Sequence, residues 1–534
     1  MLIYKNKRSL LKCVLFIVFF GLAIINMSCG TASSNDTYQD IHILTPQLTY
    51  VHQHSTTELT FTVELIHGFS MASVEIVGGS GSIINQLNET DVAGTISIEL
   101  TTGALFPTGS ITLHITDHIG NQASSTLPFN IYPTFNITTH TASAYDGLAL
   151  FSESINGDNI TYLIDHHGTI IQRWLHHDLN AVSMPYLTSD KRLIYPYKAS
   201  NLDIDTGGSG GGIQIISWSG EILWDYRIAN ETYQHHHDIE PLPNGNLLVL
   251  VWHRKTIAEA EQAGRQSMDG KVDLWSEAIF ELEPIGTNQA NIVWEWYMWD
   301  HLIQDVDATL DHFGVIADAP ELMDINTGTV GRVGQAGSRS WMHFNTIDYN
   351  EDHDFIILTS RRQNEIYVID HSTTTLQAAT HAGGTFGKGG DFLYRWGNPM
   401  NYDHGTSNDT TLSAPHSGIW IDNYLPGAGN IIVFNNNVGG SESSIIEFTP
   451  PFSNNQFTKT TSMAFEPTTY QTMTANFFSP RQSSVIRLPN GNTFIASAVD
   501  GQLIELDTNG NVAWHLTVEG VKRALMYPAD YSHD

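Results

Sequence analysis

Three short clusters built around histidine are the residues best suited to chemistry in this 534-residue chain. They are His235-His236-His237-Asp238, Trp341-Met342-His343-Phe344-Asn345 and Ala414-Pro415-His416-Ser417-Gly418. Near neutral pH an imidazole can serve as a base, an acid, a covalent nucleophile or a metal ligand. Each cluster stands just before a strand-like segment of an imperfect repeat, so a fold that gathers these segments would also gather the histidines.

The second cluster has the pattern of an anion-binding site. His343 and Asn345 are two positions apart, so on a strand their side chains would face the same way. Arg361 follows the next strand-like segment, residues 354–360, and a hairpin would return it to the side of His343. A guanidinium offers a planar fork of donors to phosphate- or sulfate-like groups. We therefore expect His343, Asn345 and Arg361 to hold an oxyanion together.

The repeat that would position these residues runs from about residue 145 to the end. Asn-Gly turns precede the apolar segments 247–250 and 493–496, and we interpret each segment as the opening strand of a unit. A third strand then often ends in a polar turn, and a fourth carries Trp174, Trp224, Trp294 or Trp514. Two weaker copies cover residues 355–370 and 431–448.

Six units of this kind favour an all-β fold, a six-bladed β-propeller, over a solenoid, whose repeats are usually shorter and more regular. In a propeller the first strand of every sheet lines a central channel, where histidines from distant clusters would meet. The competing interpretation is an array of β-sandwiches, because short strands with frequent turns also suit that fold. Residues 255–266 and 299–325 interrupt the pattern, and we expect helical or irregular insertions there.

The chain begins with the features of an exported protein. Residues 1–29 combine a basic start, an apolar run over 13–25 and small residues around Cys29, as in a secretion signal. Cys29 also fits the acylated cysteine of a bacterial lipoprotein, which predicts a membrane-anchored protein of the periplasm or cell envelope, with residues 30–40 as a polar tether. Because Cys13 lies inside the signal, the mature chain has at most one cysteine and no disulfide or zinc–thiolate site.

Two domains are expected after the tether, residues 41–135 and residues 136–534. In the first, segments 59–65, 95–100 and 110–116 alternate apolar and polar residues and are rich in Thr, which predicts the strands of a small β-sandwich. Nothing in that module suggests catalysis, so the chemistry is assigned to the second domain.

The composition narrows the classes of partner. Lys and Arg number 24 against 56 Asp and Glu, a formal net charge of -32, so no nucleic-acid partner is expected. The chain has no P-loop and no dinucleotide-binding fingerprint, since the glycine-rich residues 383–390 lack the strand–loop–helix spacing that phosphate binding needs. We expect no cofactor and no catalytic metal.

Four groups of segments carry a resemblance to a known family. They are His237-Asp238 followed by Leu242-Pro243-Asn244-Gly245-Asn246, Trp294-Glu295-Trp296 with Trp299-Asp300-His301-Leu302, the second cluster with Ser360-Arg361, and Pro415-His416. With these segments the chain resembles the bacterial arylsulfate sulfotransferases over approximately residues 145–534. The resemblance implies a propeller preceded by a sandwich. It also implies transfer of a sulfuryl group from a small aryl sulfate to a phenol without a nucleotide sulfate donor.

Matched by position, the resemblance assigns roles to residues. His416 looks like the nucleophile, and His343, Asn345 and Arg361 look like the groups that bind the sulfuryl oxygens. His237 looks like the proton donor or acceptor for the phenolic oxygen, with His236 as the alternative register.

The chain departs from the family pattern in two ways. A disulfide that family members can have near the site cannot form here, and the hydroxyl expected from the last blade is assigned to Ser483 rather than to Ser479 or Ser484.

Two other classes stay open on the residues alone. A metal-dependent propeller lyase acting on an acidic polysaccharide would use His237, His343 and His416 as ligands and Arg361 to neutralise a uronate. A surface binding module would hold a ligand in the same channel without chemistry. Activity after chelation tests the first, and turnover of an aryl sulfate would exclude the second. The physiological donor and acceptor and the oligomeric state do not follow from the sequence.

Overall fold

The computed structural model describes residues 41–532 apart from 47–49, 53–55, 78, 90, 103–107, 133–134, 156–157, 333–334, 336, 438 and 461–463. Strands dominate the described chain, and its only α-helices are the short α1 (Ile257–Gln262) and α2 (Thr375–Ala378). In this part of the chain no helix has the length and apolar character needed to cross a membrane. The chain divides into two compact units at residues 134 and 135. Residues 1–40, with the predicted signal, Cys29 and tether, lie outside the described residues.

The first unit consists of two four-stranded sheets that share one core. One sheet has the order β1 (Ile41–Leu44), β3 (Thr56–Leu65), β6 (Ala93–Thr102), β5 (Gly79–Asn85), and the other β2 (Tyr50–His52), β8 (Gln122–Tyr132), β7 (Thr108–Asp117), β4 (Phe69–Val77). The alternation in the sequence explains the packing: between Leu59 and Leu65 every second residue is buried and the residues between are exposed. Phe61 and Ile98 of one sheet and Leu113 of the other are buried in the same cluster.

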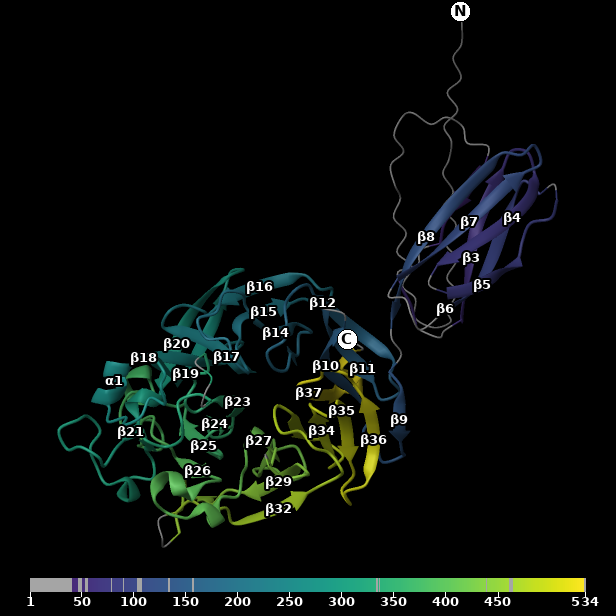
Figure 1. Ribbon diagram of the computed structural model, residues 1–534. Coiled ribbons are helices and arrows are strands. Elements are labelled where there is room, and N and C mark those ends of the chain that lie inside the picture. The colour runs from purple at the N-terminus through teal and green to yellow at the C-terminus, as the bar shows by residue number, and fades with distance from the viewer. Residues whose placement is uncertain are drawn as a thin grey trace, which may run out of the picture. The chain divides into compact units, whose positions relative to one another are not determined.

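The described part of the second unit contains six larger antiparallel sheets, which follow one another around a common centre from blue through green to yellow (Figure 1). The first three are β37 (Ala524–Pro528), β10 (Gly147–Ile155), β11 (Asp158–Asp165), β12 (Ile170–His176); β13 (Tyr186–Leu187), β14 (Leu193–Lys198), β15 (Gly211–Ile216), β16 (Ile222–Arg227); and β17 (Tyr233–Pro241), β18 (Leu247–Thr256), β19 (Asp273–Ile285), β20 (Gln289–Tyr297). The last three are β23 (Phe344–Asn350), β24 (Phe355–Ser360), β25 (Glu365–Asp370), β26 (Tyr394–Trp396); β27 (His416–Trp420), β28 (Ile431–Asn435), β29 (Ser444–Thr449), β32 (Thr469–Met473); and β33 (Ser484–Arg487), β34 (Thr493–Ser497), β35 (Gln502–Leu506), β36 (Val512–Thr517), β9 (Ile137–His140).

The first strand of this unit pairs with the last of these sheets, and its last strand pairs with the first sheet. β37, near the C-terminus, pairs with β10 of the first sheet, whereas β9, at the start of the unit, pairs with β36 of the last. Both pairings are antiparallel, so they satisfy backbone groups that would otherwise form open sheet edges. The first and last sheets are therefore joined through both ends of the unit.

The recurring tryptophans of the sequence have a common position. Each lies on a fourth strand and is buried. Its indole N–H donates to the following sheet, either to the segment after the third strand or to the first residue of the fourth. The bonds run from Trp174 to the Ser217 carbonyl (3.0 Å), from Trp224 to the Gln289 carbonyl (2.7 Å), from Trp294 to Thr373 Oγ1 (3.2 Å) and from Trp514 to the His166 carbonyl (2.8 Å). The last bond connects the last sheet to the first.

The Asn-Gly turns are hairpin turns, but they have a different place in the sheet from the one expected. Gly245 and Gly491 both adopt φ +88°, which suits glycine, and the turns join β17 to β18 and β33 to β34. The apolar segments after the turns are thus second strands, and the opening strands are the more polar segments before them. Turn chemistry identifies a hairpin, whereas the place of each strand depends on contacts distant in sequence.

Neighbouring opening strands are fixed to one another by side-chain hydrogen bonds. Thr346 Oγ1 on β23 accepts the Ser417 N–H (2.8 Å), and Ser417 Oγ accepts the Val485 N–H at the start of β33 (3.1 Å). Ser484 Oγ in turn accepts the Ala524 N–H of β37 (3.0 Å). Since the N–H groups of a sheet edge need partners, these bonds hold neighbouring opening strands at fixed separations.

The interruptions predicted in the sequence are insertions with little regular structure. The first contains α1, which begins at a capping box formed by Thr256 and Glu259. The second contains η1 (Met298–Asp300), β21 (Leu302–Ile303), η2 (Ile316–Asp318) and β22 (Met323–Asp324). The remaining short elements are η3 (Pro399–Tyr402), η4 (Ser407–Asp409), β30 (Phe452–Ser453), β31 (Gln456–Phe457) and η5 (Ala529–Ser532).

Candidate active site

Five of the predicted site residues line one open cavity of about 700 Å³ in the second unit. They come from three separate sheets: His237 from β17, His343, Asn345 and Arg361 from the sheet of β23 and β24, and His416 from β27. The other lining residues are Val182, Ser183, Thr206, Gly207, Gly208, Arg332, Arg362, Arg481, Gln482, Lys522 and Arg523. His236 and Ser483 were also predicted but do not line this cavity.

The backbone around the three histidines is irregular in the same way on each opening strand. His237 and His343 adopt positive φ (50° and 60°), as does Ser417 after His416 (52°). The pairing register of β17, β23 and β27 shifts at these points, as at a β-bulge. A left-handed conformation of a non-glycine residue costs roughly 1–2 kcal/mol. Such strain is typical of functional sites, where it directs a side chain out of the regular pleat.

His416 is held as a neutral imidazole with a defined tautomer. Its Nδ1 lies 2.7 Å from Asn436 Oδ1 and 3.1 Å from the Ala414 carbonyl, both acceptors, so Nδ1 carries the proton. Its Nε2 accepts the backbone N–H of Gln482 (3.1 Å), which requires a lone pair on that nitrogen. Burial lowers the pKa of His416 to about 3, and the positive charges of Arg361 and Arg523 act in the same direction. An unprotonated Nε2 is thus available at neutral pH.

His343 lies just before β23, and Asn345 is the extra residue of the β23 bulge. Ser340 Oγ lies 3.0 Å from His343 Nδ1, and burial, followed by the charge of Arg362, holds the pKa of His343 well below its usual range. The Asn345 amide donates to the Pro415 carbonyl (2.8 Å) beside His416. The expectation that Arg361 lies beside His343 is confirmed, since the Arg361 N–H donates to the His343 carbonyl (3.2 Å).

His237 ends a chain of polar contacts that begins at a buried carboxylate. Glu277 and His236 are both fully buried, and an oxygen of Glu277 lies 2.9 Å from His236 Nε2. His236 Nδ1 lies 2.9 Å from His237 Nδ1, and the His237 ring is 4.5 Å from that of His343. Burial and the neighbouring His343 hold the pKa of His237 well below its usual range. Of the two histidines, the cavity is lined by His237, and His236 lies behind it.

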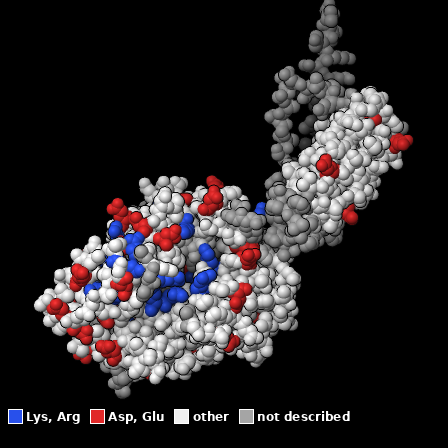
Figure 2. Space-filling view, viewed as in Figure 1, with Lys and Arg blue, Asp and Glu red and all other residues white. Residues whose placement is uncertain are grey.

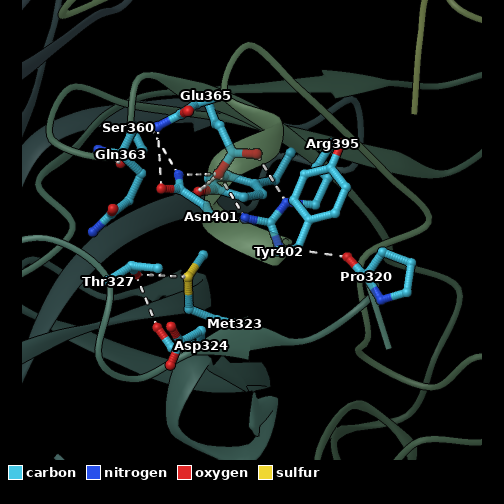
Figure 3. A network of polar contacts seen from close by, with 12 residues as sticks. Pro320, Met323, Asp324, Thr327, Ser360, Gln363, Glu365, Arg395, Asn401 and Tyr402 are labelled. Atoms are coloured by element: carbon cyan, nitrogen blue, oxygen red, sulfur yellow. Dashed lines mark hydrogen bonds and ion pairs between the residues drawn. The ribbon is translucent and has the colours of Figure 1, made fainter. Parts of the chain in front are cut away.

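The turn that carries Arg361 and Arg362 is fixed from behind by a buried network (Figure 3). Glu365 and Arg395, both fully buried, form two hydrogen bonds of 2.9 and 2.6 Å, and Asn401 bridges Glu365 Oε2 (2.7 Å) to the Gln363 carbonyl (2.9 Å). Breaking a buried pair by removing one partner typically destabilises a protein by roughly 3–5 kcal/mol, so this network holds the turn firmly.

Six cations line the cavity of a chain that is strongly acidic overall: Arg332, Arg361, Arg362, Arg481, Lys522 and Arg523. No acidic residue is among the described residues of the lining, and the blue side chains gather in a hollow of this face in Figure 2. Arg523 is neutralised in part by Asp238, at 2.5 Å. Among the described residues, the Arg361 guanidinium donates only to the Pro480 carbonyl, at 3.5 Å. Burial lowers the pKa of Arg361, as do the charges of Arg332 and Arg481. The cavity is built for an anion.

The sequence identified only Arg361 of these six cations. Arg362 and the Lys522-Arg523 pair had no usable signal, because adjacent basic residues also occur at 191–192 and 254–255, outside the cavity. Arg332 and Arg481 lie outside the strands and had none. Ser483 is fully buried, and its Oγ accepts the Ala498 N–H (3.1 Å). The hydroxyls that line the cavity are those of Ser183 and Thr206.

The Arylsulfotransferase (ASST) family model matches residues 135–505, which include the whole cavity apart from Lys522 and Arg523. This chain belongs to the arylsulfotransferase family. It is therefore an enzyme of that type, and the family implies a small aryl sulfate and a phenol as substrates. The comparison with curated proteins finds no match.

Comparison with solved structures gives weak similarities only. A catalytically inactive virginiamycin B lyase from Staphylococcus aureus, crystallised with quinupristin, is 11% identical over 74% of this chain and 89% of its own, with a TM-score of 0.32. The dihydro-heme d1 dehydrogenase NirN is 10% identical over 74% and 78% of the two chains, with a TM-score of 0.30. Similarities of this size do not bear on what this arylsulfotransferase does.

Proposed function

We propose that this arylsulfotransferase moves a sulfuryl group in two displacements through a covalent intermediate on His416. The observation that carries the proposal is the state of His416: an unprotonated Nε2, inside a cavity lined by six cations, with Nδ1–H already committed to Asn436. A neutral imidazole is a nucleophile, and fixed cations stabilise the negative oxygens of a sulfuryl group in transit.

In the first displacement the lone pair of His416 Nε2 forms the N–S bond while the S–O bond to the aryl group breaks. The phenolate leaves with the bonding electron pair and takes a proton from the solvent. The ring becomes an N-sulfo imidazolium, whose Nδ1–H gains positive character. The acceptor Oδ1 of Asn436, 2.7 Å from Nδ1, stabilises that charge. The Gln482 N–H, which now donates to Nε2, is placed to donate to a sulfuryl oxygen instead.

The oxygens of the sulfuryl group are assigned to Arg361, Asn345 and His343, with Arg362 as a further cation. The weak 3.5 Å contact of Arg361 to the Pro480 carbonyl leaves its fork of donors for substrate. Loss of one preorganised donor of this kind usually lowers turnover by about 10²–10³-fold. The buried network behind the arginine turn supports this role by fixing the guanidinium position.

In the second displacement the oxygen of the acceptor phenol attacks the sulfur while His237 takes the phenol proton. The N–S bond breaks, and its electrons return to His416. The tautomer of His237 follows from the contacts behind it. We assign the proton of His236 to Nε2, which lies 2.9 Å from a carboxylate oxygen, so that Nδ1 is an acceptor. His237 then donates from Nδ1, which leaves its Nε2 as the base. His236 and Glu277 act through His237 and are positioning residues.

The fold fits this assignment if each of the six sheets of residues 136–534 is one blade of a six-bladed β-propeller. The opening strands, which carry the histidines, would then line the channel. We read residues 41–135 as a separate β-sandwich that takes no part in catalysis. The first and last sheets are joined through β37, β9 and Trp514, which supports the propeller interpretation.

We further propose that the enzyme acts outside the cytoplasm as a lipoprotein of the bacterial cell envelope. The basis is the sequence alone: a basic start, an apolar run and Cys29 in residues 1–29, followed by the polar tether 30–40.

The decisive experiment is incubation of the purified enzyme with a chromogenic aryl sulfate, with and without an added phenol. Phenol release that depends on the acceptor, together with formation of the new aryl sulfate, is the expected result. Equal release in water would make the protein a sulfatase. Loss of turnover after chelation would instead favour metal-dependent chemistry at the histidines, and no turnover of any aryl sulfate would leave a binding module.

A further inference from the structure

Outside the active-site cavity, three histidines converge where the first and last sheets of the second unit meet. One ligand atom from each of His140, His166 and His167 lies within 4.8 Å of the other two. Their ring centroids are 4.0 to 5.1 Å apart. Nothing in the sulfuryl transfer uses these residues, since none of them lines the cavity.

The elements around the three rings are held in place without any ligand. His166 and His167 lie in the turn between β11 and β12, where Asp165 Oδ1 accepts the N–H of His167 (2.9 Å) and of Thr169 (2.8 Å). Trp514 of β36 donates its indole N–H to the His166 carbonyl (2.8 Å). His140 ends β9 and pairs with Trp514 in the ladder. One tryptophan thus holds both sides of the cluster.

A carboxylate stands behind one of the rings. Asp146 Oδ1 lies 2.7 Å from His166 Nδ1, so Nε2 is the ring nitrogen left for an external partner. Histidines that bind metals usually have a carboxylate or carbonyl beside their second ring nitrogen.

From this geometry we propose a binding site for a divalent transition metal, with zinc as the reference ion, formed by His140, His166 and His167. Three imidazoles suit Zn²⁺, Cu²⁺ and Ni²⁺, and a water molecule completes a tetrahedral zinc site. Because His140 is attached to the last sheet and His166 and His167 to the first, the ion would join the two ends of the ring. Its effect would be on stability, and not on sulfuryl transfer.

A second cluster in the described chain, His301, His381 and Asp391, provides a comparison within the same protein. There Asp391 Oδ1 lies 2.8 Å from Nδ1 of both histidines, and His301 Nε2 lies 2.8 Å from the Ala378 carbonyl. Both nitrogens of His301 therefore face acceptors, so a metal would have to displace existing bonds. We expect no metal at that cluster.

The test is titration of the untagged, chelator-treated enzyme with ZnCl₂ by calorimetry and by thermal unfolding. We expect one Zn²⁺ per chain at micromolar concentration and a rise in melting temperature of roughly 2–5 °C at saturation. His140→Ala and His167→Ala should each weaken binding by at least about tenfold and remove the rise, with sulfotransferase activity unchanged. His381→Ala, the matched control, should change neither.

Zinc binding that survives both His140→Ala and His167→Ala, or that is lost in His381→Ala, would overturn the proposal. So would the absence of any saturable binding to wild-type enzyme. Circular dichroism of the metal-free variants checks that each one is folded, because a ring that fails to close would lose binding for a different reason.

Discussion

The sharpest test of the proposed mechanism is Glu277→Gln, which changes a tautomer without changing shape. Glu277 Oε1 accepts the Phe344 N–H (3.1 Å), so the introduced glutamine must keep its oxygen on that side. Its amide NH₂ then faces His236 Nε2, where the carboxylate oxygen stood at 2.9 Å. His236 becomes an acceptor there and a donor from Nδ1. His237 must accept at Nδ1, and its Nε2 toward the cavity is protonated and can no longer act as a base.

The magnitude follows from the two contacts that are reversed. Restoring the productive tautomer in the variant means breaking two new hydrogen bonds, one from the introduced glutamine to His236 and one from His236 to His237. Neutral hydrogen bonds contribute about 0.5–1.5 kcal/mol each, so the penalty is roughly 1–3 kcal/mol. At about 1.4 kcal/mol per factor of ten, transfer to the acceptor should slow by roughly 5- to 150-fold. This is smaller than the roughly 10²–10⁴-fold expected if the base were removed outright.

The two half-reactions separate this effect from damage to the site. With donor alone, the burst of phenol from the first displacement should keep its wild-type rate, because His237 is not needed there. Transfer to a weakly acidic phenol should show the full loss, and transfer to a phenol that is already ionised should recover. The matched control is Glu281→Gln, a carboxylate buried on the same strand but outside the cavity, which should leave both steps unchanged. A slowed burst, or an equal loss with every acceptor, would refute the relay from Glu277 to His237.

Four further outcomes are expected. Arg361→Lys keeps the charge but loses the fork, so turnover should fall by about a hundredfold with the fold intact by circular dichroism, and near-normal activity would remove Arg361 from the site. His416→Asn should lose both half-reactions, and mass spectrometry after donor alone should find a sulfuryl adduct on His416 of the wild type only; a ternary-complex rate law without an adduct would contradict this. Burial holds the pKa of His176, His235 and His416 at about 3, below the unfolded value of about 6.5. The unfolded state therefore binds more protons as pH falls, and each residue should destabilise the fold by roughly 2 kcal/mol at pH 5. A melting temperature unchanged between pH 7 and 5 would contradict this. Cys29→Ser should move the enzyme from the membrane to the soluble fraction, and wild type that is already soluble would disprove the anchor.

The part of the site that follows from local geometry could be predicted from the sequence. His343, Asn345 and Arg361 belong to one hairpin, and a strand that returns antiparallel brings its end back to the start of its partner. The bond from the Arg361 N–H to the His343 carbonyl confirms that placement. The recurring tryptophans were likewise assigned to fourth strands, because a large aromatic residue at a repeated place marks a packed position.

The residues that were missed depend on closure of the second unit. Lys522 and Arg523 reach the cavity only because β37 pairs with β10, a contact with no local signature. The alternation of side chains along a strand also could not decide whether His236 or His237 lines the cavity. The register of β17 shifts between His235 and Ile239, and side chains do not alternate regularly at a bulge. Only the three-dimensional structure therefore separates the histidine in the cavity from the one behind it.

The pairing of β37 with β10 has a consequence for how the chain is made. The first sheet, residues 147–176, leaves the ribosome with one edge open, and the strand that covers it, Ala524–Pro528, is synthesised much later. The indole bond from Trp514 to this sheet joins residues 348 positions apart, so neither contact can form until the intervening chain has been made. While that intervening chain is being made, the nascent enzyme presents an unpaired strand to other chains and depends on protection from aggregation. A premature stop a few codons before β37 would leave the edge of the first sheet open. It would also remove two of the cations that line the cavity.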